Sequence, residues 1–332
     1  MSTAGEGAAP GRAVQTAPPE AAGGRERTGG QRLLTRIGSA AVLLGALLGV
    51  LFAGGVPLDV ALGLATMLGL YEYAGLAARC GVPPTPWVLY PLGGWLLYRF
   101  LLPADLPALE WALGAAVVVG LLGGLVRRPE TDAQAAGVIT PVQEPDATLR
   151  PAGSVPGAIP AFMLRWAAAV GGALYIGLTL GYYLALFRWH PAPDADRFGL
   201  RIVGVVLAGA MLGDTAALFV GSRFGRHPFF PRVSPRKTVE GALGGAGATL
   251  AAVAIGMPWL VGLAVWQSVL LGLAVAVAAQ GGDLVESALK RAAGAKDSSN
   301  LIPGHGGLLD RLDSLLLLGP VVYSFLRVAG LP

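Results

Sequence analysis

Long apolar blocks separated by short polar segments occupy most of the chain. A block of about 17 to 25 residues forms a helix long enough to cross about 30 Å of hydrocarbon at 1.5 Å per residue. The pattern therefore predicts an all-α, polytopic integral membrane protein with about nine transmembrane helices. The predicted spans are residues 35–54, 57–78, 86–102, 107–126, 160–187, 200–221, 241–257, 260–284 and 313–330.

The polar segments divide this pattern into four parts. Residues 1–32 are rich in Gly, Ala, Pro, Glu and Arg and contain almost no large apolar side chain, which predicts a disordered tail. Residues 127–156 carry proline and both signs of charge, which predicts a linker. This linker separates an N-terminal transmembrane half, 33–126, from a C-terminal transmembrane half, 157–332.

The basic residues indicate how the chain is oriented. If the N-terminus is cytoplasmic, most Lys and Arg fall in cytoplasmic segments, including the tail and the linker. The outer segments then keep little more than Arg99, Arg188, Arg197 and Arg201. The positive-inside rule therefore predicts a cytoplasmic N-terminus and a cytoplasmic linker.

Composition narrows the chemistry. The chain is 54% hydrophobic and 13% charged, and its net charge of +4 includes no long basic run with interleaved aromatics, so nucleic-acid binding is not expected. The single cysteine, Cys80, excludes an internal disulfide and a thiolate cluster, so any metal must be held by oxygen. No HExxH, GxSxG or Walker A pattern occurs. The glycines of "EGALGGAGATL" are more typical of close helix packing than of dinucleotide binding.

Ionisable residues at membrane depth are unevenly distributed. Each costs about 2.5 to 3.5 kcal/mol on insertion scales, so a cluster of them suggests function. The N-terminal half has Glu72 in "LYEYAGL". The C-terminal half places six acidic residues near the predicted cytoplasmic ends of its helices: Asp214, Glu240, Asp283, Glu286, Asp310 and Asp313. We therefore expect the functional site in the C-terminal half.

Two polar segments could bind ions. In "GDTAALFVGSRFGRH", Asp214 lies within a span whose end carries Arg223 and Arg226, which suits a cation held beside an anion, or an ion pair with a neighbouring helix. In "SPRKTVEG", Arg236 and Lys237 precede a helix start, where free backbone N–H groups and the helix dipole favour phosphate. A positive-inside anchor would explain the same basic pair.

A third segment adds more acidic residues. Asp283, Glu286, Ser287 and Lys290 are spaced i, i+3, i+4 and i+7 and so share one helical face. A Gly-rich loop follows, and then "LLDRLDS" places two carboxylates, Asp310 and Asp313, one turn apart at a helix start. Together with Asp283 they could supply oxygen ligands to Mg²⁺.

The loop between these carboxylates is suited to phosphate. Three glycines lie around His305 and would let the backbone approach a phosphate closely. Basic groups nearby would balance the charge of a polyphosphate. They are Lys290, Arg291, Lys296 and Arg311.

These residues carry a resemblance to a known family. The run from Ser287 through Lys290–Arg291 and Lys296–Asp297 to "HGGLLDRLD" resembles the signature of the phosphatidate cytidylyltransferases, or CDP-diglyceride synthases. "SPRKTVEG", "QGGD" and "GDTAALFVGSRFG" are similar to further elements of that family, and "YEYAGLA" to a short acidic-aromatic element. The resemblance is close over residues 200–315.

The resemblance implies an enzyme that joins CTP to phosphatidic acid, giving CDP-diacylglycerol and pyrophosphate at the lipid bilayer, and it suggests a homodimer. Mg²⁺ would be held by Asp283 and Asp310 with Asp313 in support, and Asp214 would complete the cation site or position a second cation. Lys237 and Lys290 would bind phosphates. The remaining expected substrate-binding residues are Arg223, Arg236, Ser287, Lys296, His305 and Arg311.

Three alternative functions can be compared with this sequence, and the first is the alternative that it leaves open. A CTP-dependent polyprenol or lipid kinase would use similar groups but transfer the γ-phosphoryl group. A CDP-alcohol phosphotransferase needs a DGxxAR element, which does not occur. A transporter would place polar residues near the midplane in both halves. The preference for Arg over Lys and the compact length favour a bacterial plasma membrane.

Overall fold

The computed structural model describes residues 38, 41–42, 45–102, 161–189, 197–302 and 306–330. Within these ranges the chain is helical, with no β-strand and only two isolated β-bridges. The predicted tail 1–32, span 107–126, linker 127–156 and residue His305 lie outside the described residues. The helices are α2 (Gly55–Arg79), α3 (Pro86–Tyr98), α6 (Ala161–Gly172), α7 (Thr179–Phe187), α8 (Phe198–Phe224), α9 (Val239–Leu260), α10 (Val265–Ala292) and α11 (Leu309–Val328). Two shorter segments are also helical, a 3₁₀ turn at Arg99–Leu101 and a π-helix at Ala173–Leu178.

The helices confirm a multi-pass membrane protein. Five of them are long and apolar enough to cross a membrane. They are α2, the continuous helix Ala161–Phe187 that contains α6 and α7, and then α8, α9 and α10. Each overlaps a predicted span.

The largest boundary difference concerns α10. The apolar pattern predicts 260–284, whereas the helix runs from Val265 to Ala292. It begins later because Gly262, with a φ of 77°, departs from helical backbone geometry between α9 and α10. It ends later because polar side chains continue it, with contacts from Asp283 to Ser287 and from Glu286 to Lys290.

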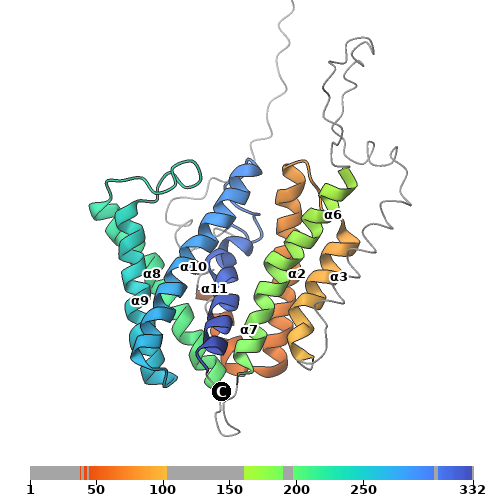
Figure 1. Cartoon of the computed structure of the whole chain (residues 1–332). Coiled ribbons are helices and arrows are strands. Elements are labelled where there is room, and N and C mark those ends of the chain that lie inside the picture. The colour runs from red at the N-terminus through yellow and green to blue at the C-terminus, as the bar shows by residue number, and fades with distance from the viewer. Residues whose placement is uncertain are drawn as a thin grey trace, which may run out of the picture.

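The helices form two groups that meet at α11 (Figure 1). On one side α8 packs along α9, and α9 packs on α10. On the other side α3 packs on α2 and on the segment that joins α6 to α7. Because α11 contacts both α10 and α7, it links the two groups.

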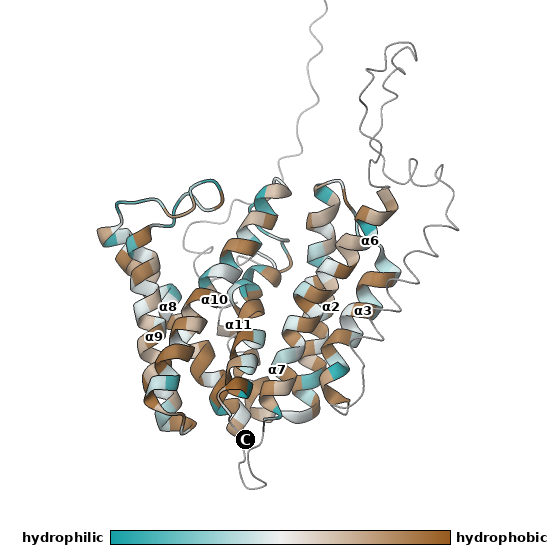
Figure 2. Ribbon diagram, viewed as in Figure 1, coloured by the Kyte–Doolittle hydropathy of each residue, from teal (hydrophilic) through white to brown (hydrophobic). Residues whose placement is uncertain are grey.

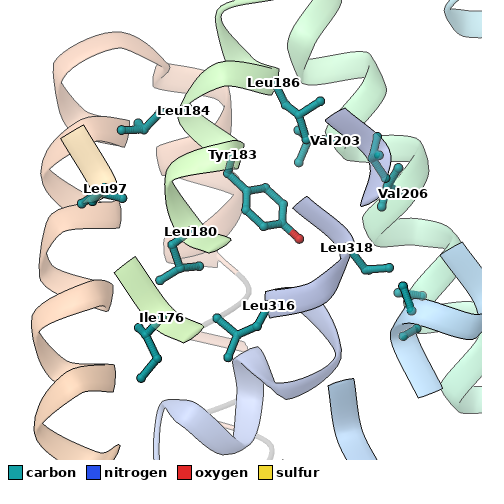
Figure 3. Close-up of a cluster of buried hydrophobic side chains, with 14 of the residues drawn as sticks. Leu97, Ile176, Leu180, Tyr183, Leu184, Leu186, Val203, Val206, Leu316 and Leu318 are labelled. Atoms are coloured by element: carbon teal, nitrogen blue, oxygen red, sulfur yellow. The ribbon is translucent and has the colours of Figure 1, made fainter. Parts of the chain in front are cut away.

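The core at this junction is apolar with one polar anchor (Figure 3). Leu180 of α7, Leu316 of α11 and Val203 of α8 are almost fully buried. Tyr183 projects from α7 toward α11, and its hydroxyl donates a hydrogen bond of 2.8 Å to the carbonyl of Leu315. The tyrosine therefore fixes α7 against α11.

Glycines allow the helices to approach closely, as "EGALGGAGATL" predicted. A Cβ at Gly245 of α9 would lie 2.8 Å from the carbonyl oxygen of Gly213 in α8, and one at Gly241 would lie 2.8 Å from that of Ala217. Real side chains do not come this close. The α8–α9 contact therefore depends on these glycines.

The same constraint applies at the π-helix, which lies against α3. A Cβ at Gly177 would overlap the carbonyl of Gly93 and lie 2.7 Å from its Cα. Only backbone borders this position, so no side chain can rotate away to make room.

We predict that Gly177→Ala lowers the stability of the detergent-solubilised protein by about 1 to 3 kcal/mol, the usual cost of overpacking. Thermal unfolding measures it. The matched control is Gly204→Ala, because Gly204 also lies inside a helix but has open space around its Cα. Equal melting temperatures for the two variants would contradict the close contact between the π-helix and α3.

Candidate active site

Hydrophilic residues gather at one end of the bundle, along the loop between α8 and α9 and at the adjoining end of α10 (Figure 2). Local hydrogen bonds shape this loop. Thr238 caps α9, because its hydroxyl accepts the N–H of Gly241 at 3.2 Å. The Glu240 carboxylate accepts the N–H groups of Arg226 and His227 at 3.0 and 3.3 Å and contacts the His227 ring at 2.6 Å. The loop therefore returns onto the start of α9, and the helix start predicted in "SPRKTVEG" is confirmed at Val239.

A cavity of about 410 Å³ lies between this loop and helices α8, α9 and α10. Its polar lining combines both signs of charge, since Arg236, Lys237, Asp214 and Asp283 all line it. Leu218 and Phe229 supply part of the apolar lining. The cavity therefore brings together three predicted segments, "GDTAALFVGSRFGRH", "SPRKTVEG" and "QGGD".

An ion pair joins the loop to α10 inside this cavity. The ammonium group of Lys237 contacts Oδ2 of Asp283. The Ser287 hydroxyl, one turn further along α10, donates to Oδ1 of Asp283 at 3.2 Å. Lys237 and Ser287 therefore both contact the Asp283 carboxylate.

A second polar cluster lies at the junction of α10 and α11. Lys290 contacts Glu286, which is fully buried, and Oδ1 of Asp310 at 2.6 Å. Oδ2 of Asp310 accepts the N–H and the hydroxyl of Ser298, at 2.9 and 2.8 Å, and the N–H of Gly307 at 2.8 Å. Asp310 therefore holds the α10–α11 loop as well as Lys290.

The two clusters are linked where α10 crosses α11. A Cβ at Gly282 would overlap the carbonyl of Asp313 and lie 3.2 Å from Cα of Ser314. This close crossing places Asp313 near Asp283, the residue that follows Gly282. One oxygen of Asp313 accepts the N–H of Ser314 at 2.5 Å.

The three predicted metal ligands do not form a ready-made site. Among the described residues, no group of three or more His, Cys, Asp or Glu side chains is close enough to hold an ion. Asp283 is paired with Lys237, and Asp310 with Lys290. The oxygen donors still suit Mg²⁺, and Asp283 and Asp313 lie at the same crossing, whereas Asp310 would have to exchange Lys290 for the ion.

Three further predicted residues lie outside these clusters. Arg223 is exposed at the end of α8, next to the cavity residue Ser222, with its guanidinium 5.8 Å from the Phe224 ring centre. Lys296 and Arg311 are exposed, in the α10–α11 loop and in the first turn of α11.

Glu72 of α2 contacts the second cluster, although the sequence pointed to the C-terminal half for the site. This side chain is 2% exposed and accepts hydrogen bonds from Ser298, Ser299, Leu308 and Leu309. Its charge at membrane depth and the resemblance of "YEYAGLA" to a family element were the signals in the sequence. No spacing rule connects it to partners more than 200 residues away. Gln280, the first residue of "QGGD", lines the cavity, and its amide donates a hydrogen bond to the Ala242 carbonyl at 2.9 Å. The sequence analysis gave it no role of its own.

Comparisons with known proteins identify the family of this chain. The chain is 43% identical over 129 residues to an uncharacterized protein, YnbB, of Escherichia coli, and 37% identical over 163 residues to a phosphatidate cytidylyltransferase of Bacillus subtilis. These alignments cover 39% and 47% of this chain, but only 43% and 56% of those relatives. A phosphatidate cytidylyltransferase of Synechocystis is 31% identical over 296 residues, which is 87% of this chain and 95% of the relative. Because a model of the Cytidylyltransferase family also matches residues 34–329, this protein belongs to that family.

Proposed function

We propose that this protein transfers the cytidylyl group of CTP to phosphatidic acid, giving CDP-diacylglycerol and pyrophosphate. The observation that carries this proposal is the cavity that two basic residues, Arg236 and Lys237, line together with Asp214 and Asp283. Such a site offers cationic groups to phosphates beside carboxylates that can hold a metal ion. The family and the names of two relatives support the same reaction.

In this reaction an oxygen of the lipid phosphate forms a bond to the α-phosphorus of CTP. The bond from that phosphorus to the bridging oxygen of the β-phosphate breaks, and pyrophosphate leaves with the electron pair. The attacking phosphate is already an anion, so the step needs no general base. The protein then has to orient the reactants and stabilise the charge that develops, for which Arg236 and Lys237 are placed.

The lipid substrate can reach the cavity from the membrane. Leu218 lines the cavity and is 71% exposed on α8, a helix apolar enough to span the bilayer. In the proposed topology the exposed side of Leu218 would face the hydrocarbon of the bilayer. Phosphatidic acid could keep its acyl chains in the bilayer while its phosphate enters beside Arg236.

For the metal we propose Asp283 and Asp313 as ligands, with Asp310 joining them once it releases Lys290, and Asp214 as a candidate for a second cation. A bound Mg²⁺ would neutralise phosphate charge and make pyrophosphate a better leaving group. Lys237 and Lys290 then bind phosphates in place of their carboxylate partners, with Arg223, Ser287, Lys296, His305 and Arg311 around the substrate.

We further propose nine membrane spans, a cytoplasmic N-terminus and a bacterial plasma membrane location. In this topology the linker 127–156 is cytoplasmic. The cavity of the catalytic half 157–332 then opens at the cytoplasmic surface, where CTP is present. The distribution of Lys and Arg supports it. A homodimer, which the resemblance suggests, belongs to the same proposal.

Transfer of label from α-³²P-CTP into an extractable lipid tests the reaction. With phosphatidic acid and Mg²⁺ we expect labelled lipid from the wild-type protein and a loss of about 100-fold or more in Asp283→Asn, because that change removes a charge from the centre of the site. Asp59→Asn is the matched control, since Asp59 is also ion-paired, to Arg188 at 2.6 Å, but lies near the opposite end of α2 from Glu72. Lipid labelled instead from γ-³²P-CTP would identify a CTP-dependent lipid kinase, and no lipid label from folded protein would overturn both.

The dependence of the rate on Mg²⁺ concentration tests the ligand assignment. Asp313→Asn should raise the Mg²⁺ concentration for half-maximal rate by at least about tenfold, since it removes an anionic oxygen from the ion. Asp59→Asn should leave this concentration unchanged. A slower Asp313→Asn enzyme with an unaltered Mg²⁺ dependence would show that Asp313 is not a ligand.

Cys80 tests the orientation, because it is the single cysteine of the chain and is exposed at the end of α2. If the N-terminus is cytoplasmic, the second predicted span returns the chain to the cytoplasm at this residue. A membrane-impermeant maleimide should then label inverted vesicles but not intact cells. Labelling of intact cells, absent in Cys80→Ser, would reverse the topology.

A further inference from the structure

We infer that Glu72 is a positioning residue by which α2 holds the described part of the α10–α11 loop, residues 293–302 and 306–308, in the conformation that the active site requires. The expected effect on catalysis rests on the proposed function. The claim that Glu72 holds the loop does not depend on that function. It assigns to the N-terminal half a direct part in building the site.

The Glu72 carboxylate is fully occupied by groups of this loop and of the start of α11. Oε1 accepts the hydroxyl of Ser299 at 2.6 Å and the N–H of Leu308 at 2.9 Å. Oε2 accepts the hydroxyl of Ser298 at 3.0 Å and the N–H of Leu309 at 2.7 Å. Each oxygen thus has one side-chain donor and one backbone donor, and the side chain is 2% exposed.

This environment requires a carboxylate. The first N–H groups of a helix have no partner within the helix, and the helix dipole favours a negative charge beside them. Among the described residues no Lys, Arg or His forms an ion pair with Glu72, and the four hydrogen bonds stabilise its negative charge. An amide in its place would turn its NH₂ group toward one pair of donors and leave them unsatisfied.

Ser298 extends the contact from Glu72 to the site. Its N–H and hydroxyl reach Asp310 at 2.9 and 2.8 Å, while the same hydroxyl is 3.0 Å from Glu72. Because a hydroxyl carries one proton, it donates to one carboxylate at a time and lies between the two. Asp310 in turn contacts Lys290, so a continuous set of polar contacts runs from α2 to the polar face of α10.

The loop closes on Glu72 without spare room. A Cβ at Gly307 would overlap the Ser298 hydroxyl and lie 2.6 and 2.7 Å from the two Glu72 oxygens. The sequence suggested that the loop glycines admit a phosphate. At Gly307 the group that approaches the backbone is instead the protein's own carboxylate.

Glu72→Gln in the full-length protein tests the inference, with Asp59→Asn as the control for loss of an acidic side chain on the same helix. We expect hydrogen exchange to quicken at least tenfold in peptides containing Leu308 and Leu309, and kcat/KM for CTP to fall at least about tenfold, because two charge-assisted hydrogen bonds are lost. Peptides from α8 should exchange as in the wild type. Asp59→Asn should change neither readout.

Ser299→Ala provides a second variant if Glu72→Gln does not fold. It removes one donor and should quicken the same exchange and lower kcat/KM by a smaller factor, about threefold to tenfold. Unchanged exchange at Leu308 and Leu309 in the variants, with or without a loss of activity, would overturn the positioning role. A wild-type protein without cytidylyltransferase activity would overturn the proposed reaction, while the exchange measurement would still test the contact.

Discussion

The end of the bundle that carries the candidate active site depends on one constraint, which is that each buried charge must be compensated. A carboxylate at membrane depth is costly unless other groups neutralise it or donate hydrogen bonds to it. Here the compensating groups come from other segments. Asp283 of α10 is paired with Lys237 from the α8–α9 loop, Asp310 of α11 with Lys290 of α10, and Glu72 of α2 with donors of the α10–α11 loop. Each pairing draws two segments together, so the charges that form the site also determine how the helix ends converge.

These pairings are possible because the helices approach closely. Short side chains such as Asp and Ser reach only a few ångströms, so the backbones that carry them must nearly touch. Gly282 lets α10 pass against the carbonyl of Asp313, and Gly245 lets α9 pass against that of Gly213. A larger residue at either crossing would separate the helices and move the carboxylates away from their partners. The glycines therefore contribute to the chemistry of the site through packing.

The sequence predicted what depends on local periodicity. Apolar blocks located the described helices. The spacing predicted that Asp283, Glu286, Ser287 and Lys290 share one helical face, and the contacts of Asp283 with Ser287 and of Glu286 with Lys290 agree with it. It could not predict contacts between distant segments, because periodicity carries no information about which helices become neighbours. Glu72 was recognised as an unusual charge, but its partners at Ser298 and Leu309 follow only from the fold.

The charge balance of the site explains why its lysines lie on carboxylates and why a cation is expected with the substrates. Five carboxylates, Asp214, Asp283, Glu286, Asp310 and Asp313, gather around three cationic groups, Arg236, Lys237 and Lys290. In this arrangement the acidic groups are in excess and attract the lysines. A triphosphate and a lipid phosphate would add negative charge, and Lys237 and Lys290 could bind these phosphates only by leaving their carboxylates. The carboxylates would then need positive charge of their own, and a divalent cation with oxygen ligands meets that need.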